Sequence, residues 1–427
     1  MKTSNPFVAE EEKNSHKKSI LLIALCWIVY TCSYLGKLGY NANITKIESV
    51  YNVSHSTAGV VSTFFFFSYG IGQILNGFFC KKYHLRFMVF GALLLSALMN
   101  ILVAICTNFS LLKYFWLING LALSVLWPSL IRVLSENLDK KDMGKAVIVM
   151  GTTVATGTLL IYGLSALCVA LGSYTTTFFI AGILLPIIAF TWFFSCNKLT
   201  SNDKAEEGVE VNANAPQKSA SGSLKDNHLL SSVCVLAFFA VIVNLVKDGL
   251  TTWVPMILKE TYELPDYASI LLTLVLPILA IFGTSVAVFL RKKVNDFIGL
   301  CSVLFAIASG FIFITLLCLP TNLFLISLLA FGAVACTMSG VNNVITSMTP
   351  LYWKDKVNSG KLAGILNGFC YLGSTLSSYG LGLISDVAGW NAVLILLLSL
   401  CVLCVIIATI YFAIKKRVKG LQGSKGI

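Results

Sequence analysis

Residues 21–44 read LLIALCWIVYTCSYLGKLGYNANI, an apolar run long enough to cross a membrane, with a lysine at position 37. A second run, LSSVCVLAFFAVIVNLVKDGLT at residues 230–251, carries Lys247 in the corresponding place. Lys37 lies 16 residues after Leu21 and Lys247 lies 17 residues after Leu230, so both are roughly 25 Å along a helix. A buried ammonium is costly unless it faces a polar cavity, a partner or a ligand. We therefore expect a central anion site between two structural repeats.

The composition of the whole chain is that of a membrane protein. Its 427 residues are 57% hydrophobic and only 12% charged, whereas a soluble domain carries roughly twice that charged fraction. The net charge of +12 does not indicate nucleic-acid binding, because the basic residues lie at the ends of apolar runs. The 13 cysteines are dispersed through apolar stretches, where a thiol acts as a small hydrophobe. We expect no metal site, no cofactor and no nucleic-acid partner.

Twelve apolar runs predict an all-α membrane protein with twelve transmembrane helices. They lie at approximately 19–44, 57–80, 86–106, 112–136, 144–170, 174–196, 229–258, 265–290, 297–319, 322–348, 360–385 and 391–414. Pro128, Pro186 and Pro277 are expected to interrupt their helices.

A hydrophilic stretch without helical periodicity separates the first six runs from the last six. The predicted segments are an N-terminal segment 1–18, a six-helix bundle 19–196, a linker 197–228, a second six-helix bundle 229–414 and a basic tail 415–427.

Lysine and arginine predict the orientation of the chain. One alternating set of connections is rich in them and the opposite set is poor. The rich set comprises Lys17, Lys18, Lys81, Lys82, Arg86, Lys140, Lys141, Lys145, Arg291, Lys292, Lys293, Lys354, Lys356, Lys415, Lys416, Arg417 and Lys419. By the positive-inside rule, both termini and the linker are cytoplasmic. We expect a multi-pass protein of the cell (inner) membrane, in contact with lipid and monomeric.

The first span carries a polar stripe, because Tyr30, Tyr34, Lys37 and Asn41 recur at helical spacing. Tyrosine and asparagine alone could serve as hydrogen-bonding contacts between helices, but such contacts do not require a charge.

The seventh span carries an equivalent stripe of Asn244, Lys247 and Thr251, with Asp248 beside it. Asp248 either neutralises Lys247 with no ligand involved, or tunes the charge selectivity or proton coupling of a ligand site.

Several stretches resemble the organophosphate:inorganic phosphate antiporters, a family of the major facilitator superfamily that includes glycerol-phosphate and hexose-phosphate exchangers. They are YLGK at 34–37, SYG at 68–70, GLALSVLWPSLIR at 120–132, KDG at 247–249, LKE at 258–260, LAGILNGFCYLG at 362–373 and DVAGW at 386–390. The resemblance runs from about residue 20 to 415, apart from the linker.

The resemblance implies a major facilitator fold of two six-helix halves with the substrate near the midplane. It also implies that Lys37 and Lys247 clamp a phosphate, while Tyr34, Tyr69 and Tyr371 line the pocket; Asn244 joins them from the polar stripe. Two further residues have a gate or structural role: Trp127, and Arg132, which either snorkels or caps helix ends. The small residues at Gly364, Gly368, Gly373, Ser374, Ser377 and Ser378 are expected to serve close helix packing.

The sequence departs from the family pattern in three ways. Both clamp positions, typically arginine, are lysine here, and lysine lacks the planar fork that binds phosphate oxygens bidentately. The span-five stretch 151–156 reads GTTVAT without the family's histidine, and Gln73 stands where a span-two lysine is expected.

We therefore expect a secondary transporter of a small organic anion, with a sugar phosphate or glycerol phosphate exchanged for inorganic phosphate by alternating access. One alternative is a proton-coupled carrier of a carboxylate or other solute that uses Asp248 as the titrating group. Another is a membrane sensor that binds a phosphorylated ligand without transporting it. Enzyme activity is not expected, since the sequence offers no nucleophile–base pair, and no Walker sequence indicates ATP.

Overall fold

The computed structural model describes residues 6–79, 84–200, 227–321, 323–353, 357 and 359–423. All the regular elements in these ranges are helices, which confirms the predicted all-α class. Most of the predicted linker, 201–226, lies outside the described residues, as do the last four residues of the basic tail.

The chain forms two compact units, Met1–Tyr40 with Ser68–Gln217, and Asn41–Phe67 with Lys218–Ile427. The first unit holds most of α1 (Pro6–Ala42), the second part of α3 (His55–Phe79), α4 (Leu85–Ile105), α5 (Phe109–Leu123), α6 (Leu126–Asn137), α7 (Lys140–Gly151), α8 (Thr153–Ala170) and α9 (Thr175–Leu199).

The second unit begins with the end of α1, with α2 (Ile44–Tyr51) and with the first part of α3. It continues with α10 (Asn227–Tyr262), α11 (Asp266–Leu272), α12 (Val275–Ala280), α13 (Gly283–Arg291), α14 (Phe297–Cys318), η3 (Leu319–Thr321), α15 (Phe324–Asn343), η4 (Val344–Met348), α16 (Thr349–Tyr352) and α17 (Ser359–Gly423). Residues 41–67 therefore pack with the second half of the sequence, although they precede the linker by more than a hundred residues.

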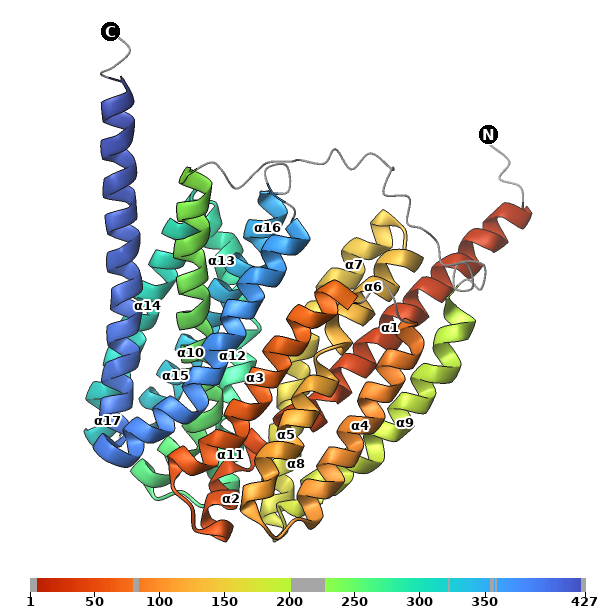
Figure 1. The fold of residues 1–427 in the computed structure, drawn as a ribbon, viewed down its shortest axis with the longest axis horizontal. Helices are drawn as coiled ribbons and strands as arrows, with labels where there is room; N and C mark the ends of the chain where they lie inside the picture. The colour runs from red at the N-terminus through yellow and green to blue at the C-terminus, as the bar shows by residue number, and fades with distance from the viewer. Residues whose placement is uncertain are drawn as a thin grey trace. The chain divides into compact units, whose positions relative to one another are not determined.

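The spans agree with the predicted number. Among the described residues, eleven helical stretches are long and apolar enough to cross a membrane. The last of them, Leu362–Lys416, has 55 residues and contains Gly389, whose φ of 75° is not helical. Figure 1 shows the chain turning sharply within α17, so this stretch supplies two of the twelve predicted spans.

Two of the three prolines expected to break helices do so. Proline has no N–H, so it leaves the carbonyl four residues earlier without its helical partner. Correspondingly, α5 ends just before Ser124, four residues before Pro128, and α11 ends just before Thr273, four residues before Pro277. The prediction was wrong for Pro186, which lies inside the uninterrupted helix α9.

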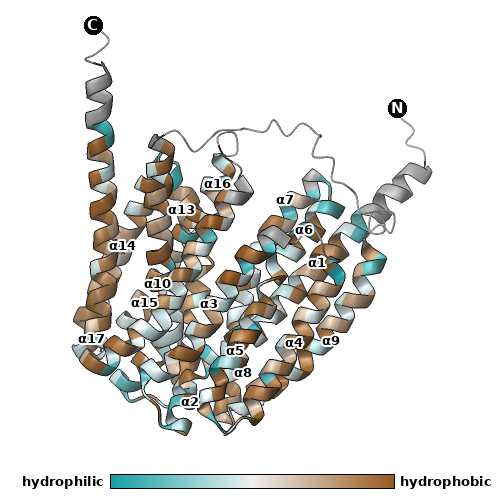
Figure 2. Ribbon diagram, viewed as in Figure 1, coloured by the Kyte–Doolittle hydropathy of each residue, from teal (hydrophilic) through white to brown (hydrophobic). Residues whose placement is uncertain are grey.

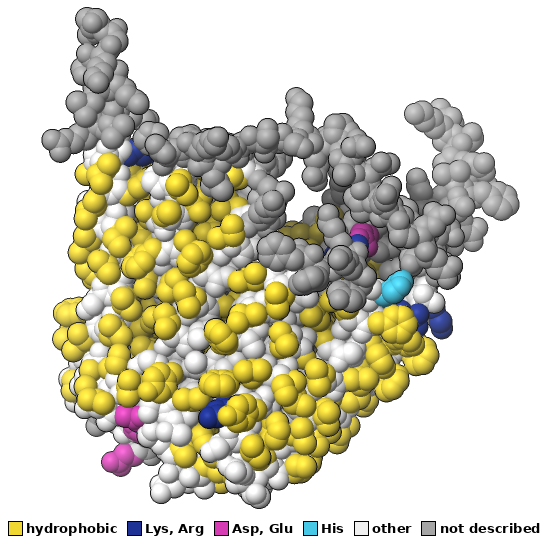
Figure 3. Space-filling view, viewed as in Figure 1, with side chains coloured by type: hydrophobic (Ala, Val, Ile, Leu, Met, Phe, Trp, Pro, Cys, Tyr) yellow, Lys and Arg dark blue, Asp and Glu magenta, His cyan; other side chains and the backbone are white. Residues whose placement is uncertain are grey.

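The outward-facing side chains are those expected in lipid. Large apolar residues such as Ile148, Phe194 and Leu325 are more than half exposed. Figure 2 shows hydrophobic residues along most of the helix lengths, and Figure 3 shows hydrophobic side chains covering the visible face of the described residues. A soluble monomer rarely exposes apolar patches of this extent, so the fold requires a membrane around it.

Helix pairs within each unit approach closely at glycines. In the first unit, α9 lies against α4, where a Cβ at Gly182 would collide with Ile101. In the second, α17 lies against α10, where a Cβ at Gly373 would collide with the carbonyl of Val241. The predicted packing role is thus confirmed for Gly373, whereas Gly364 has open space beside it.

Candidate functional site

The first unit holds Lys37 among aromatic rings. Helix α1 buries Lys37, which is 7% exposed, and its Nζ lies 4.2 Å from the ring centroid of Tyr69 and 5.1 Å from that of Tyr34. The amide of Gln73, one turn beyond Tyr69 on α3, donates to the Tyr69 hydroxyl at 3.3 Å. We call Tyr34, Lys37, Tyr69 and Gln73 the Lys37 cluster. In this cluster, Tyr34 of α1 and Tyr69 and Gln73 of α3 lie around the ammonium group of Lys37.

Local packing holds the rings of the Lys37 cluster in place. A Cβ at Gly157 of α8 would lie 2.6 Å from Cγ of Tyr34, so the small residue makes room for that ring. Tyr30 meets Tyr34 edge to face at 5.7 Å, and Trp127 lies 4.8 Å from Tyr30 between ring centroids. Trp127 therefore packs against the tyrosine that adjoins the Lys37 cluster, and its gate or structural role stays a prediction.

The Lys37 cluster stabilises a positive charge without removing it. The face of an aromatic ring attracts an ammonium electrostatically, by up to about 2 kcal/mol when both are desolvated. A tyrosine ring carries no formal charge, so the cation keeps its attraction for an incoming anion. The hydroxyls of Tyr34 and Tyr69 add further groups that can donate to anionic oxygens.

The second unit holds Lys247 beside an acid. On α10, Lys247 Nζ lies 3.5 Å from Asp248 Oδ1, and the two side chains are 26% and 19% exposed. The other oxygen, Asp248 Oδ2, accepts hydrogen bonds from the hydroxyl of Ser374 on α17 and from the amide of Asn244 at 3.3 Å. Asp248 is therefore a direct partner of Lys247. The clamp role of Lys247 stays a prediction.

A polar chain extends from Asp248 across three helices. Asn342 of α15 donates to the amide oxygen of Asn244 at 2.8 Å, and Asn244 donates to Ser374 at 3.1 Å. We call Asn244, Lys247, Asp248, Asn342 and Ser374 the Lys247 cluster. Two residues after Asn342, at Val344, the helix widens into the π-helical turn η4, a distortion frequent at functional sites.

Two members of the Lys247 cluster were missed in the sequence. Ser374 was assigned to helix packing with its small neighbours, and Asn342 was not singled out. The contact of Gly373 with α10 brings the next residue, Ser374, within reach of Asp248. A polar residue directly after a glycine in an apolar span was the available signal.

Two further predicted site residues are placed on their helices but not tied to a ligand. Tyr371 lies on α17 three residues before Ser374, so the two share a helix face. Arg132 on α6 forms an ion pair with Glu136, 2.6 Å from Nε to Oε1, one turn later on the same helix. The pocket role of Tyr371 and the gate role of Arg132 stay predictions.

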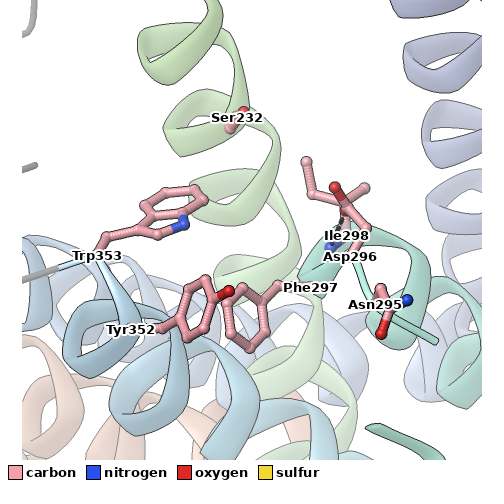
Figure 4. Close-up of a pocket in the computed structure, with 7 residues that line it drawn as sticks. All are labelled: Ser232, Asn295, Asp296, Phe297, Ile298, Tyr352 and Trp353. Atoms are coloured by element: carbon pink, nitrogen blue, oxygen red, sulfur yellow. Dashed lines mark hydrogen bonds between the residues drawn. The ribbon is translucent and has the colours of Figure 1, made fainter. Parts of the chain in front are cut away.

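A small pocket of the second unit lies away from Lys247. Figure 4 shows its seven lining residues: Ser232, Asn295, Asp296, Phe297, Ile298, Tyr352 and Trp353. Ser232 precedes Lys247 by 15 residues of α10, roughly 22 Å along the helix. The carboxylate of Asp296 caps α14 by accepting from the backbone N–H groups of Ile298 and Gly299. The pocket thus belongs to a helix junction rather than to the predicted site.

The whole chain is similar to curated membrane proteins. The chain is 20% identical over 387 residues to the membrane sensor protein UhpC of Escherichia coli, covering 87% of each chain. It is 22% identical over 418 residues to a probable hexose phosphate transport protein of Chlamydia pneumoniae, covering 90% of this chain and 88% of that one. The resemblance to organophosphate carriers inferred from the motifs is confirmed.

Solved structures share the fold. A bacterial homologue of the human lysosomal transporter Spinster, in an inward-facing and unoccupied conformation, matches with a TM-score of 0.72 and 14% identity, over 94% of this chain and 97% of that one. The nucleoside transporter NupG matches with a TM-score of 0.70 and 13% identity, over 92% of this chain and all of that one. Residues 26–359 match the Major Facilitator Superfamily itself, and the chain belongs to that family.

Proposed function

We propose that this membrane protein is a secondary active transporter of a small organic anion. The substrate class is a sugar phosphate or glycerol phosphate, exchanged for inorganic phosphate by alternating access. Lys37 and Lys247 supply the positive charge, Tyr34, Tyr69, Tyr371 and Asn244 supply further contacts, and Asp248 sets the charge selectivity.

The observation that carries this proposal is the buried ammonium of Lys37. An amine kept inside a membrane protein marks a functional site by default, because its desolvation is costly. The rings of Tyr34 and Tyr69 stabilise the cation and carry no formal charge themselves. The hexose phosphate transport protein among the relatives supports a phosphorylated ligand.

Transport by purified protein in proteoliposomes tests the proposal. Exchange predicts uptake of a labelled sugar phosphate that requires phosphate or substrate inside the vesicles and survives a protonophore. Uptake into empty vesicles driven by a pH gradient would instead indicate the proton-coupled carrier. Vesicles without protein and vesicles containing Lys37→Ala are the controls.

A sensor is the second candidate, because one of the relatives is a membrane sensor protein. A sensor binds its ligand and transports nothing. Thermal stabilisation of the purified protein by sugar phosphates, together with no uptake under any gradient, would support this candidate and contradict the transporter.

The predicted surroundings follow the same proposal. Both termini face the cytoplasm, the membrane is the bacterial inner membrane that the relatives suggest, and the protein acts as a monomer. Accessibility of single cysteines placed near residues 17 and 416, measured with a membrane-impermeant maleimide in intact cells, tests the orientation; labelling there would contradict it.

A further inference from the structure

Four ionisable side chains from four helices meet in the second unit. They lie near those helix ends that are predicted to face the outside of the cell. They are Glu48 of α2, His55 at the start of α3, Glu260 of α10 and Asp386 of α17; we call them the His55 cluster. His55 Nδ1 lies 2.8 Å from Glu48 Oε2, and His55 Nε2 lies 3.2 Å from Glu260 Oε1. The stretches 258–260 and 386–390 are among those that resemble the antiporter family, but the sequence assigned no function to them.

The geometry around His55 requires an extra proton. A neutral imidazole donates from one ring nitrogen only, and its other nitrogen accepts. Here both nitrogens face carboxyl oxygens. Either the imidazole is protonated on both nitrogens, or one of the carboxyl groups holds the proton. In both cases the cluster holds one proton more than a neutral histidine surrounded by ionised acids.

Burial of Glu48 reinforces the need for this proton. Glu48 is only 6% exposed, and its second oxygen, Oε1, accepts no hydrogen bond from any described residue. Taking a charged oxygen out of water without a donor is costly, and burial accordingly raises the pKa of the Glu48 carboxyl.

The neighbouring lysines make their ion pairs with Asp266, and Lys259 also acts electrostatically on Glu260. Lys259 Nζ lies 2.8 Å from Asp266 Oδ1, and Lys46 Nζ lies 3.9 Å from Asp266 Oδ2. The His55 cluster itself has three carboxyl groups against one imidazole. Protonation is therefore the direct way in which it loses negative charge.

The same cluster holds the first turn of α3 against α17 and α10. Asp386 accepts hydrogen bonds from the backbone N–H groups of His55 at 3.0 Å and Ser56 at 2.9 Å. The indole of Trp390 donates to Glu260 at 2.6 Å, and its ring lies 5.1 Å from that of His55. These bonds join residues far apart in the sequence through a few charged groups.

Glycines let the backbones touch at this contact. A Cβ at Gly59 would collide with the carbonyl oxygen of Ser378, and a Cβ at Gly382 would lie 2.8 Å from the carbonyl oxygen of His55. The ring of Trp253 also lies 5.9 Å from that of His55, so the charged groups of the His55 cluster act on a contact that is already close and apolar.

We propose that the His55 cluster is a proton-binding latch: with the proton bound it holds residues 44–58 against α10 and α17, and loss of the proton releases them. Closure then takes up a proton and opening gives it back, by linkage between binding and conformation. If the protein transports as proposed, the substrate pathway should open faster on this side at higher pH, and this consequence rests on the proposed transport function. The binding of the proton and the release of the contact do not depend on that function.

Hydrogen–deuterium exchange of the full chain without substrate tests the latch. Peptides covering 44–58 and 380–391 are followed over a pH series, with intrinsic exchange rates corrected for. We expect protection at low pH and at least about tenfold faster exchange once the proton is lost, the factor that one pKa unit of coupling provides. His84→Gln, which removes an exposed histidine outside the cluster, is the matched control and should leave the profile unchanged.

Two variants make the outcome decisive. His55→Gln can donate from one end and accept at the other, like neutral imidazole, and should give fast exchange with no pH dependence. Glu260→Gln keeps a similar shape and removes one acid, so it should move the transition to lower pH.

Corrected exchange that does not vary with pH in the wild-type protein, or an unmoved transition in Glu260→Gln, would overturn the latch. Absence of uptake in proteoliposomes would count against transport alone, because exchange is measured without substrate.

Discussion

Lys37 and Lys247 occupy matching places in the sequence and have different surroundings. Lys37 lies against the rings of Tyr34 and Tyr69, whereas Lys247 lies 3.5 Å from the carboxylate of Asp248. Aromatic rings stabilise a cation and leave its net charge, but a carboxylate cancels it. In the proposed function, this difference means that the Lys37 cluster would supply net attraction for an anion, and that the Lys247 cluster would set how much charge the anion can carry.

The largest expected effect follows from removing the charge of the buried Lys37. Lys37→Ala should lower kcat/KM for anion uptake by about a hundredfold or more, the size expected when a desolvated charge loses its partner. Initial rates in proteoliposomes, normalised to the folded protein on size-exclusion chromatography, measure the effect. Lys37→Arg should retain part of the activity, and Lys292→Ala, at an exposed lysine, should retain all of it. Normal transport by Lys37→Ala would break the comparison.

Removing a ring next to Lys37 should come second. Tyr69→Leu loses the nearer cation–ring contact, 4.2 Å from Nζ, and should raise KM by roughly thirtyfold, which corresponds to about 2 kcal/mol. Tyr69→Phe keeps the ring and removes only the hydroxyl, so its uptake kinetics should remain much closer to wild type. Equal losses in the two variants would show that the hydroxyl matters and the ring does not.

Neutralising the acid next to Lys247 sharpens the comparison. Asp248→Asn leaves Lys247 uncancelled and should shift preference towards dianions by about tenfold, as one pKa unit of interaction would. Competition between a singly and a doubly charged substrate analogue, repeated across pH, provides the measurement. If neither selectivity nor pH dependence changes, Asp248 is only a structural partner of Lys247.

The smallest expected effect concerns a neutral member of the Lys247 cluster. Ser374→Ala removes one donor to Asp248 and leaves every charge in place, so the loss should be about 1 kcal/mol, or roughly fivefold in KM. Ser378→Ala, one helical turn later, is the matched control because Ser378 donates to the backbone carbonyl of Ser374. An effect as large as that of Asp248→Asn would mean that the hydroxyl contacts the substrate itself.

The sequence by itself determined the properties that depend on nearby residues. Apolar runs of membrane length establish the spans, Lys and Arg at their ends predict the orientation, and the depth of Lys37 and Lys247 follows from counting along a helix. The helix breaks at Pro128 and Pro277 were also predicted, whereas the intact helix at Pro186 shows that a missing N–H alone does not end a helix.

Only the tertiary structure decided which polar groups meet. Ser374 and Asp248 are 126 residues apart, and His55 and Asp386 are 331 apart. No local pattern relates such positions, because their contact depends on how α3, α10 and α17 pack at glycines. The sequence therefore determined how far along its helix each charge lies, and the fold determined which groups surround it. Those neighbours set the electrostatic energy of a charge inside a membrane.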